Sequence, residues 1–222
     1  MLAILGLTFA TSYMLTACDD DDDDTVTETT SGSSASGTIG SYGYVDLGLP
    51  SELKWALYNV GADSPVGFGD YFAWGEIESA DEFTSDNSST YGVEMSDISG
   101  DSSYDAASAI WGSTWRMPTQ EEFDELLDEC SWSYTTKSGV VGYLVTGSNG
   151  NAIFLPAAGH YDGSTLMHSG TCGTYWSSTP NSSNNSIAYY LISTAVTITC
   201  TAIIATTEAL FAPYRNNTKI HL

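Results

Sequence analysis

Cys18 is the residue whose surroundings point to one specific reaction. It ends the run Leu15-Thr16-Ala17-Cys18 and follows a stretch, residues 1–17, that carries no charged side chain. Six consecutive aspartates come directly after it. The apolar stretch has the length and character of a signal peptide and is too short to span a bilayer as a helix. A thiol that such a segment holds at a membrane surface, behind small residues that a peptidase can accept, is suited to lipid attachment.

The spacing Leu-Thr-Ala-Cys resembles a bacterial lipobox. This resemblance implies that residues 1–17 are a lipoprotein signal peptide, that Cys18 is lipidated, and that the lipid joins the protein to a membrane. The acidic side chains repel one another and keep the next segment extended and solvated. That segment consists of Asp19, Asp20, Asp21, Asp22, Asp23 and Asp24.

The acidic run is either a plain spacer or a sorting signal. Its place directly after the cysteine resembles the surface-export signal of lipoproteins in the Bacteroidetes, and we favour the signal. This predicts a lipid-anchored protein of the outer membrane, at the cell surface. Asp24-Thr25-Val26 also resembles the O-glycosylation acceptor pattern of these bacteria, which makes Thr25 a candidate acceptor.

The other cysteines and the histidines lack the spacing of a metal site. Three cysteines remain, an odd number without a CxxC pair: Cys130, Cys172 and Cys200. We expect structural thiols, with a Cys130–Cys172 disulfide as the alternative that export permits. His160 and His168 are expected to be polar loop residues, and His221 has no partner in spacing. Since no nucleophile elbow, phosphate loop or EF-hand loop occurs either, we predict no catalytic residue, no metal and no cofactor.

The charge of the chain excludes one class of partner. It is −23, from 28 acidic and 5 basic residues. The aspartate run supplies only six of these acids, so the remainder is acidic too. Without a basic stripe to meet phosphates, we predict no nucleic-acid binding.

The composition divides the chain into an anchor, a tether, a domain and a tail. Residues 18–41 contain the cysteine, the acidic run and a Thr-, Ser- and Gly-rich segment that is typical of a flexible tether. Residues 42–191 carry the apolar signal of one domain. Residues 192–222 differ from them in composition.

Within the domain, turn signals separate short predicted strands. Strands are predicted over 44–47 and 54–58, with a turn at Gly48-Leu49-Pro50 between them. Two further strands, over 142–146 and 152–156, flank a hairpin turn.

Two helices and a long loop are also expected. Thr119 and Glu122 have the spacing of a capping box, and the apolar residues after them continue at helical spacing to about Cys130. Residues 105–110 predict a second short helix. The polar stretch 78–100 predicts a long surface loop.

A series of motifs along the domain identifies a family. They are Tyr44-Val-Asp-Leu-Gly-Leu-Pro-Ser-Glu-Leu-Lys-Trp55, Gly69-Asp-Tyr-Phe-Ala-Trp-Gly-Glu76, Trp111-Gly-Ser-Thr-Trp-Arg-Met-Pro-Thr119, Phe154-Leu-Pro-Ala-Ala-Gly159, Tyr175-Trp-Ser-Ser-Thr-Pro180 and Ala188-Tyr-Tyr-Leu191. In this order they resemble the FISUMP family (Fibrobacter succinogenes major paralogous domain), found in lipoproteins of Bacteroidetes and Fibrobacter. The resemblance covers about residues 42–191. It implies an α+β fold that is C-type-lectin-like and formylglycine-generating-enzyme-like, with short helices around a small antiparallel sheet and long loops.

The family resemblance implies binding at the cell surface. We therefore take Trp74, Glu76 and Trp176 as candidate ligand contacts. Trp176, like Trp55, Trp111 and Trp115, either stacks on a sugar or fills the core, and we favour the core. For Glu76 we favour a structural hydrogen bond. The calcium motif of sugar-binding lectins is not expected, because Thr179-Pro180-Asn181 lacks its carboxylate.

Arg116 lies between Trp115 and Met117, and we expect it to form an ion pair with a nearby acid.

The sequence thus predicts a surface lipoprotein with a non-catalytic binding or adhesion module for a glycan or a protein. The alternatives are a structural subunit of a surface appendage, a formylglycine-generating-type enzyme, and an inactive frameshifted copy.

The frameshift alternative comes from the tail. After Leu191 the resemblance stops, whereas a family member ends in Arg-Tyr-Tyr-Gly, two variable residues and Val-Arg-Pro-Val. An alternative reading frame joins the third base of each codon to the first two bases of the next codon. In that frame the codons of Ala205-Thr-Thr-Glu208 can encode the first motif, and those of Phe211-Ala-Pro-Tyr214 can encode the second. We therefore hypothesise a frameshift near Leu191. The alternative is a divergent strand, since Val196-Thr-Ile-Thr199 alternates like one.

Overall fold

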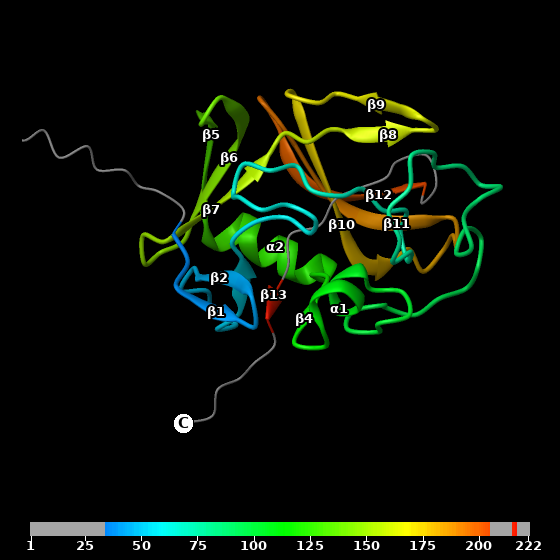
Figure 1. Ribbon diagram of the computed structural model, residues 1–222, viewed down its shortest axis with the longest axis horizontal. Coiled ribbons are helices and arrows are strands. Elements are labelled where there is room, and N and C mark those ends of the chain that lie inside the picture. The colour runs from blue at the N-terminus through cyan, green and yellow to red at the C-terminus, as the bar shows by residue number, and fades with distance from the viewer. Residues whose placement is uncertain (1–33, 205–214, 217–222) are drawn as a thin grey trace, which may run out of the picture. The chain divides into compact units, whose positions relative to one another are not determined.

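The computed structural model describes residues 34–204 and 215–216, which contain two short helices and several small antiparallel sheets. This confirms the expected α+β class at a coarse level, and strands dominate it. Figure 1 shows the arrangement, with the longer helix below the green strands and above the blue N-terminal strands, and with long loops on one side.

The largest sheet joins segments from both ends of the described chain. Its strand order is β1 (Gly37–Ile39), β2 (Tyr42–Asp46), β3 (Lys54–Ala56), β13 (Arg215–Asn216) and β4 (Trp115–Arg116). The predicted strands near Tyr44 and Trp55 and the turn between them are confirmed. β13 lies between β3 and β4 and pairs antiparallel with both.

The turn between β2 and β3 is closed by polar contacts of Asp46. Its carboxylate accepts a hydrogen bond from Gly48 N at 2.9 Å, and the ammonium of Lys54 contacts the same carboxylate. Hydrogen bonding by Lys54 lowers the pKa of Asp46. Gly48 has a φ of 68°, a left-handed conformation that glycine adopts without strain.

Helix α2 (Gln120–Glu129) begins at the predicted capping box. The Thr119 hydroxyl accepts from Glu122 N, and the Glu122 carboxylate accepts from Thr119 N at 3.0 Å. Phe123 and Leu126 are fully buried. The helix packs against β10, β11 and β12.

A three-stranded sheet follows α2. It consists of β5 (Ser131–Lys137), β6 (Val140–Thr146) and β7 (Ala152–Pro156) in chain order. The hairpin predicted at residues 147–150 joins β6 to β7, as expected. Every residue of β7 is buried, whereas β5 is largely exposed.

The second three-stranded sheet reaches into the tail. β10 (Cys172–Pro180), β11 (Ile187–Thr194) and β12 (Ile198–Ile204) are again in chain order. β12 pairs with β11 from Ile187 to Ser193, which agrees with the alternating pattern noted in this part of the tail. The frameshift hypothesis concerns the gene and stays a prediction, and its segment 205–214 lies outside the described residues.

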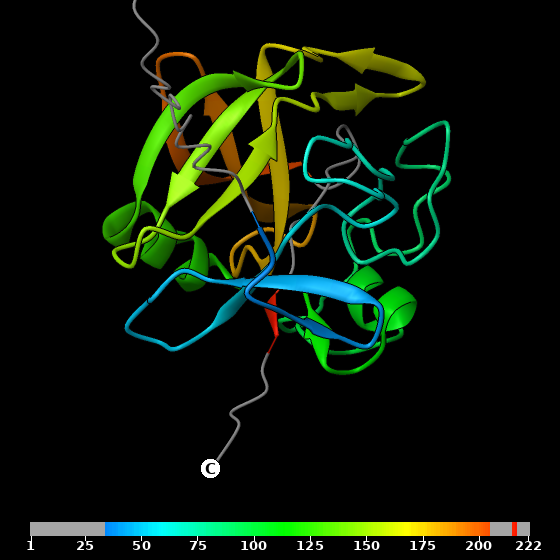
Figure 2. The same cartoon turned by 60° about the vertical axis from the view of Figure 1, so that its left-hand side comes forward.

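Two smaller elements complete the fold. Helix α1 (Ala106–Trp111) confirms the predicted short helix, with Asp105 as its N-cap. The hairpin of β8 (His160–Asp162) and β9 (Thr165–Met167) projects beside the loops, as Figures 1 and 2 both show.

The core lies between α2, the sheets and the loops. Its largest fully buried side chains are Trp55, Trp115, Trp176, Tyr175, Phe123, Phe154, Leu47, Leu126 and Ile153. The expectation that Trp55, Trp115 and Trp176 fill the core is therefore confirmed. Trp111, which was expected there too, is only partly buried and packs against the edge of the core.

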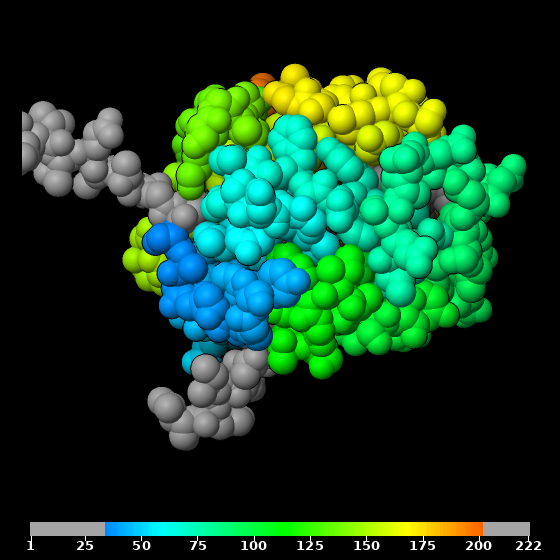
Figure 3. Space-filling view, in the orientation of Figure 1, coloured from blue at the N-terminus to red at the C-terminus, as the bar shows by residue number. Residues whose placement is uncertain are grey.

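The predicted long loop over residues 78–100 has no helix or named strand. In the space-filling view this loop is teal and covers the right-hand side of the visible face, below the yellow β8–β9 hairpin (Figure 3). Phe83, Thr90 and Ile98 are buried at intervals along it. The loop is thus attached to the domain at several points.

Candidate functional site

The anchor residues predicted from the sequence lie outside the described part of the chain. These are Cys18, the acidic run from Asp19 to Asp24, and Thr25. Their roles stay predictions.

Trp74 and Trp176, two of the candidate ligand contacts, are core residues. Their side chains are 3% and 1% exposed. The indole N–H of Trp74 donates to Ser177 O at 2.9 Å, and that of Trp176 donates to Phe72 O at 3.2 Å. These bonds cross-link the 72–74 segment to β10. Because both rings are enclosed, neither presents a face on which a ligand could stack.

Glu76, the third candidate contact, has the structural role that we favoured. Its carboxylate accepts from Ser89 N at 2.7 Å, and the neighbouring Thr90 hydroxyl donates to Trp74 O at 2.6 Å. These bonds fasten the long loop to the turn at residues 74–76.

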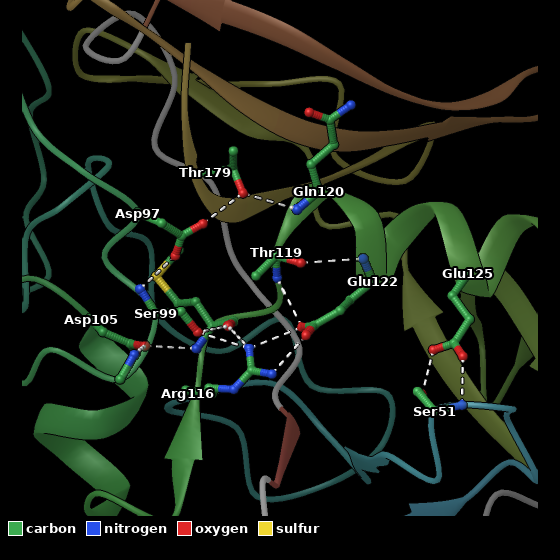
Figure 4. Close-up of polar contacts among 12 residues, drawn as sticks. Ser51, Asp97, Ser99, Asp105, Arg116, Thr119, Gln120, Glu122, Glu125 and Thr179 are labelled. Carbon is green, nitrogen blue, oxygen red and sulfur yellow. Dashed lines mark hydrogen bonds and ion pairs between the residues drawn. The ribbon is translucent and has the colours of Figure 1, made fainter. Parts of the chain in front are cut away.

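Arg116 forms the predicted ion pair, and Glu122 is its partner (Figure 4). The pair is bidentate, with Nη1 to Oε2 at 2.9 Å and Nη2 to Oε1 at 2.7 Å. Nη1 also donates to Ser99 Oγ at 2.8 Å and to Met117 O at 3.1 Å. Since Glu122 also belongs to the capping box, one carboxylate fixes β4, the long loop and the start of α2.

Asp105 is the most deeply buried acid in the described residues, at 0% exposure. Its Oδ1 accepts from Ala107 N and Ser108 N, at 2.9 and 3.1 Å. Its Oδ2 accepts from Gly100 N and Met117 N, both at 2.8 Å. Burial raises the pKa of Asp105, while the four amide donors act in the opposite direction. Because the donors engage both oxygens, the geometry suits the ionised carboxylate.

A third acid, Asp97, extends this set to β10. The Thr179 hydroxyl donates to Asp97 Oδ2 at 2.8 Å and accepts from Gln120 N at 3.1 Å, while Ser99 N donates to Asp97 Oδ1. We refer to Asp97, Ser99, Asp105, Arg116, Glu122 and Thr179 as the Arg116 network. Figure 4 shows that its members point toward one another. Each of these residues forms a bond with another part of the fold, so the network serves to position the loops.

Three partly buried aromatic rings form a cluster that the sequence indicated only in part. Trp111, at the end of α1, stacks on Tyr42 of β2 with ring centroids 4.2 Å apart and planes at 17°. Tyr58 meets Trp111 edge-on at 6.2 Å. Ile110, which precedes Trp111 in α1, is 43% exposed. Partly exposed aromatic rings of this kind are suited to contact with apolar or sugar surfaces. We refer to Tyr42, Tyr58 and Trp111 as the aromatic cluster.

The thiols of Cys130 and Cys200 are free, so the Cys130–Cys172 disulfide does not form. Burial, with Glu125 and Glu129 nearby, raises the pKa of Cys130 to about 11. Burial, with Asp124 and Glu121 nearby, raises the pKa of Cys200 to about 12. Both thiols are therefore protonated at neutral pH and are poor nucleophiles.

His160 is the first residue of β8, so the expected loop position is wrong for it, and the β8–β9 hairpin brings it close to His168. Their ring centroids are 5.1 Å apart. Burial, and secondarily His168, lowers the pKa of His160, while Asp162 acts in the opposite direction. The helical and CxxC spacings that indicate metal sites in a sequence could not indicate this pair, because a hairpin creates the contact.

Among the described residues, no three His, Cys, Asp or Glu side chains converge closely enough to hold one metal ion. In the same residues, no helix has the length and apolar character needed to cross a bilayer. Comparison with models of protein families, with curated proteins and with solved structures gave no match.

Proposed function

We propose that this chain is a lipid-anchored lipoprotein of the outer membrane that displays a non-catalytic FISUMP-type binding module with a C-type-lectin-like fold. The observation that carries the proposal is the lipobox-like Leu15-Thr16-Ala17-Cys18 followed at once by six aspartates. In this proposal the lipid is attached to Cys18 and the acidic run directs the protein to the cell surface. The predicted tether is shorter than the sequence indicated, because Gly37–Ile39 form β1 of the domain. The residues before this strand, 25–36, then separate domain and membrane by on the order of 20 Å.

The domain offers support for binding rather than catalysis. The Arg116 network and the buried residues of the long loop hold an extended loop surface in one arrangement, and a preorganised surface loses little entropy on binding. A formylglycine-generating enzyme needs a reactive cysteine pair. The raised pKa values of Cys130 and Cys200 favour the binding module over that alternative.

The aromatic cluster is our candidate for the ligand-contacting surface. Its rings are partly exposed, whereas Trp74 and Trp176 are enclosed. Aromatic faces bind the apolar faces of sugars and aliphatic side chains alike. The strong negative charge disfavours anionic ligands, so a neutral glycan or a basic protein surface fits best.

The anchor is tested by Cys18→Ala in cells that receive an alkyne-labelled fatty acid. The unaltered chain should incorporate the label and should be cleaved by protease added to intact cells, whereas Cys18→Ala should incorporate none. A second variant replaces the six aspartates by serine and should be lipidated but protected from the protease. Equal labelling of Cys18→Ala and the unaltered chain would refute the anchor.

The binding surface is tested separately on glycan and protein arrays with the non-lipidated full chain. Trp111→Ala should reduce binding to any ligand found by about tenfold, since hot-spot aromatics contribute about 1–2 kcal/mol each. Tyr104→Ala is the matched control, because Tyr104 is 40% exposed and lies outside the cluster. Equal losses in the two variants, or no ligand on either array, would argue against the proposal.

A further inference from the structure

The β8–β9 hairpin places two imidazoles at the spacing of a metal chelate. In its register His160 lies opposite Met167, and His168 follows directly. The His160 and His168 ring centroids are 5.1 Å apart, with an angle of 46° between the planes. His168 is exposed and His160 is half-buried, so the pair opens toward solvent on one side.

The backbone around the pair is fixed by close contacts. Gly159 has a φ of 76°, and a Cβ built there would lie 2.2 Å from Met167 O. Only glycine therefore permits the two chain segments to approach as they do. His168 itself has a φ of 55°, which is uncommon for a residue with a side chain.

Hydrogen bonds hold His168 in this left-handed conformation. Its carbonyl accepts from Thr171 N and Cys172 N, both at 3.0 Å. The tip of the hairpin is also held, because Phe83 N donates to Gly163 O at 3.0 Å. Strained backbone that is fixed by its surroundings is typical of functional positions.

We propose that His160 and His168 bind a zinc-class divalent cation, with Asp162 as a third ligand. In a zinc site each imidazole centroid lies about 3.2 Å from the ion, that is, a Zn–N bond of about 2.1 Å plus about 1.1 Å within the ring. At the tetrahedral angle, two such centroids are about 5.2 Å apart. The 5.1 Å between the two ring centroids matches this separation.

Asp162 is placed to complete the site. It is two residues from His160 on the same strand, so both side chains lie on one face of the hairpin. It is also exposed, so its side chain is free to rotate toward the pair. In the described conformation the three groups do not yet converge, and ion binding recruits the carboxylate. Water takes the fourth position, as is usual where three protein ligands hold zinc.

The test is a calorimetric titration of the metal-free full chain with Zn²⁺ alone. We expect one Zn²⁺ per chain at the pair, and His168→Gln should lower the affinity about tenfold or more. Because His168 is exposed, this variant should keep its fold, which thermal unfolding checks. His221→Gln removes the third histidine of the chain and is the matched control, with unchanged affinity expected. Asp162→Asn should lower the affinity by about threefold or more.

A second measurement separates this site from the acidic run. Zn²⁺ should shift the imidazole nitrogen signals of His160 and His168 in NMR spectra, whereas binding by Asp19 to Asp24 would leave them in place. Equal Zn²⁺ affinity of His168→Gln and the unaltered chain, or imidazole signals that do not move, would overturn the proposal. These outcomes are independent of the lipid anchor and of the aromatic cluster.

Discussion

Replacing Asp105 by Asn tests whether the buried carboxylate holds the long loop to α1 and β4. Asn has the same shape, but only one of its two terminal atoms accepts hydrogen bonds. Two of the four backbone amides that now face Asp105 therefore lose their acceptor and face an NH₂ group instead. Each buried donor left unsatisfied costs about 1–3 kcal/mol, so we expect the free energy of unfolding to fall by about 3 kcal/mol.

Urea unfolding followed by the fluorescence of the six tryptophans measures this loss. With a denaturant slope of about 2 kcal/mol per M, the midpoint should fall by about 1.5 M. Asp101→Asn is the matched control, because Asp101 is exposed and, within the described residues, its carboxylate accepts from Ser103 N alone, at 3.0 Å. Its effect should stay within about 0.5 kcal/mol. If Asp105→Asn were as mild as the control, the carboxylate would not hold these segments together.

Four further predictions address other features. Arg116→Lys keeps the charge but loses the bidentate contact with Glu122, so the free energy of unfolding should fall by about 1–2 kcal/mol. An unchanged midpoint of urea unfolding would contradict this. Because the pKa of Cys130 is about 11, the rate at which Cys130 is alkylated in the Cys200→Ser variant should rise about tenfold per pH unit from pH 7 to pH 10. Rapid labelling of Cys130 at pH 7 would show that its thiol is not protected by burial. The pKa of Asp46 is lowered from 3.8 in the folded protein, so its ion pair contributes stability that is fully present above pH 3.8 and is lost as the pH falls through the folded-state pKa. Lys54→Gln should therefore make the free energy of unfolding less sensitive to acid, as unfolding curves at several pH values would show. Resequencing codons 188–215 should reveal a frameshift near Leu191, and one clean frame without the family ending in an alternative frame would exclude it.

The parts of the fold that were predicted correctly are those indicated by residues close together in the sequence. The capping box at Thr119 and Glu122 and the turn after β6 are short-range features, so both appear in the structure where the sequence placed them. β5 was not predicted, although Ser131-Trp132-Ser133-Tyr134-Thr135 alternates polar and aromatic residues with the period of a strand. β10 was also missed, since all but its last two residues are buried and a continuous run lacks period-two alternation.

The site was harder to predict because its contacts join distant segments. An acidic partner for Arg116 was expected, but only the fold identifies Glu122. Trp176 and Trp111 look alike in the sequence, yet one is enclosed by β10 packing and the other remains partly exposed. The His160–His168 contact likewise depends on the register of a hairpin that the sequence did not indicate.

The position of β13 has a consequence for the order of folding. β3 and β4 are held together through a strand that follows every other element of the described chain. During synthesis β3 and β4 each therefore keep an unpaired edge, and the five-stranded sheet is completed only when residues 215–216 have emerged. An exported lipoprotein of the kind that we propose has to cross a membrane before it folds. A sheet in which this interior strand is added last would delay folding until translocation of the domain is nearly complete.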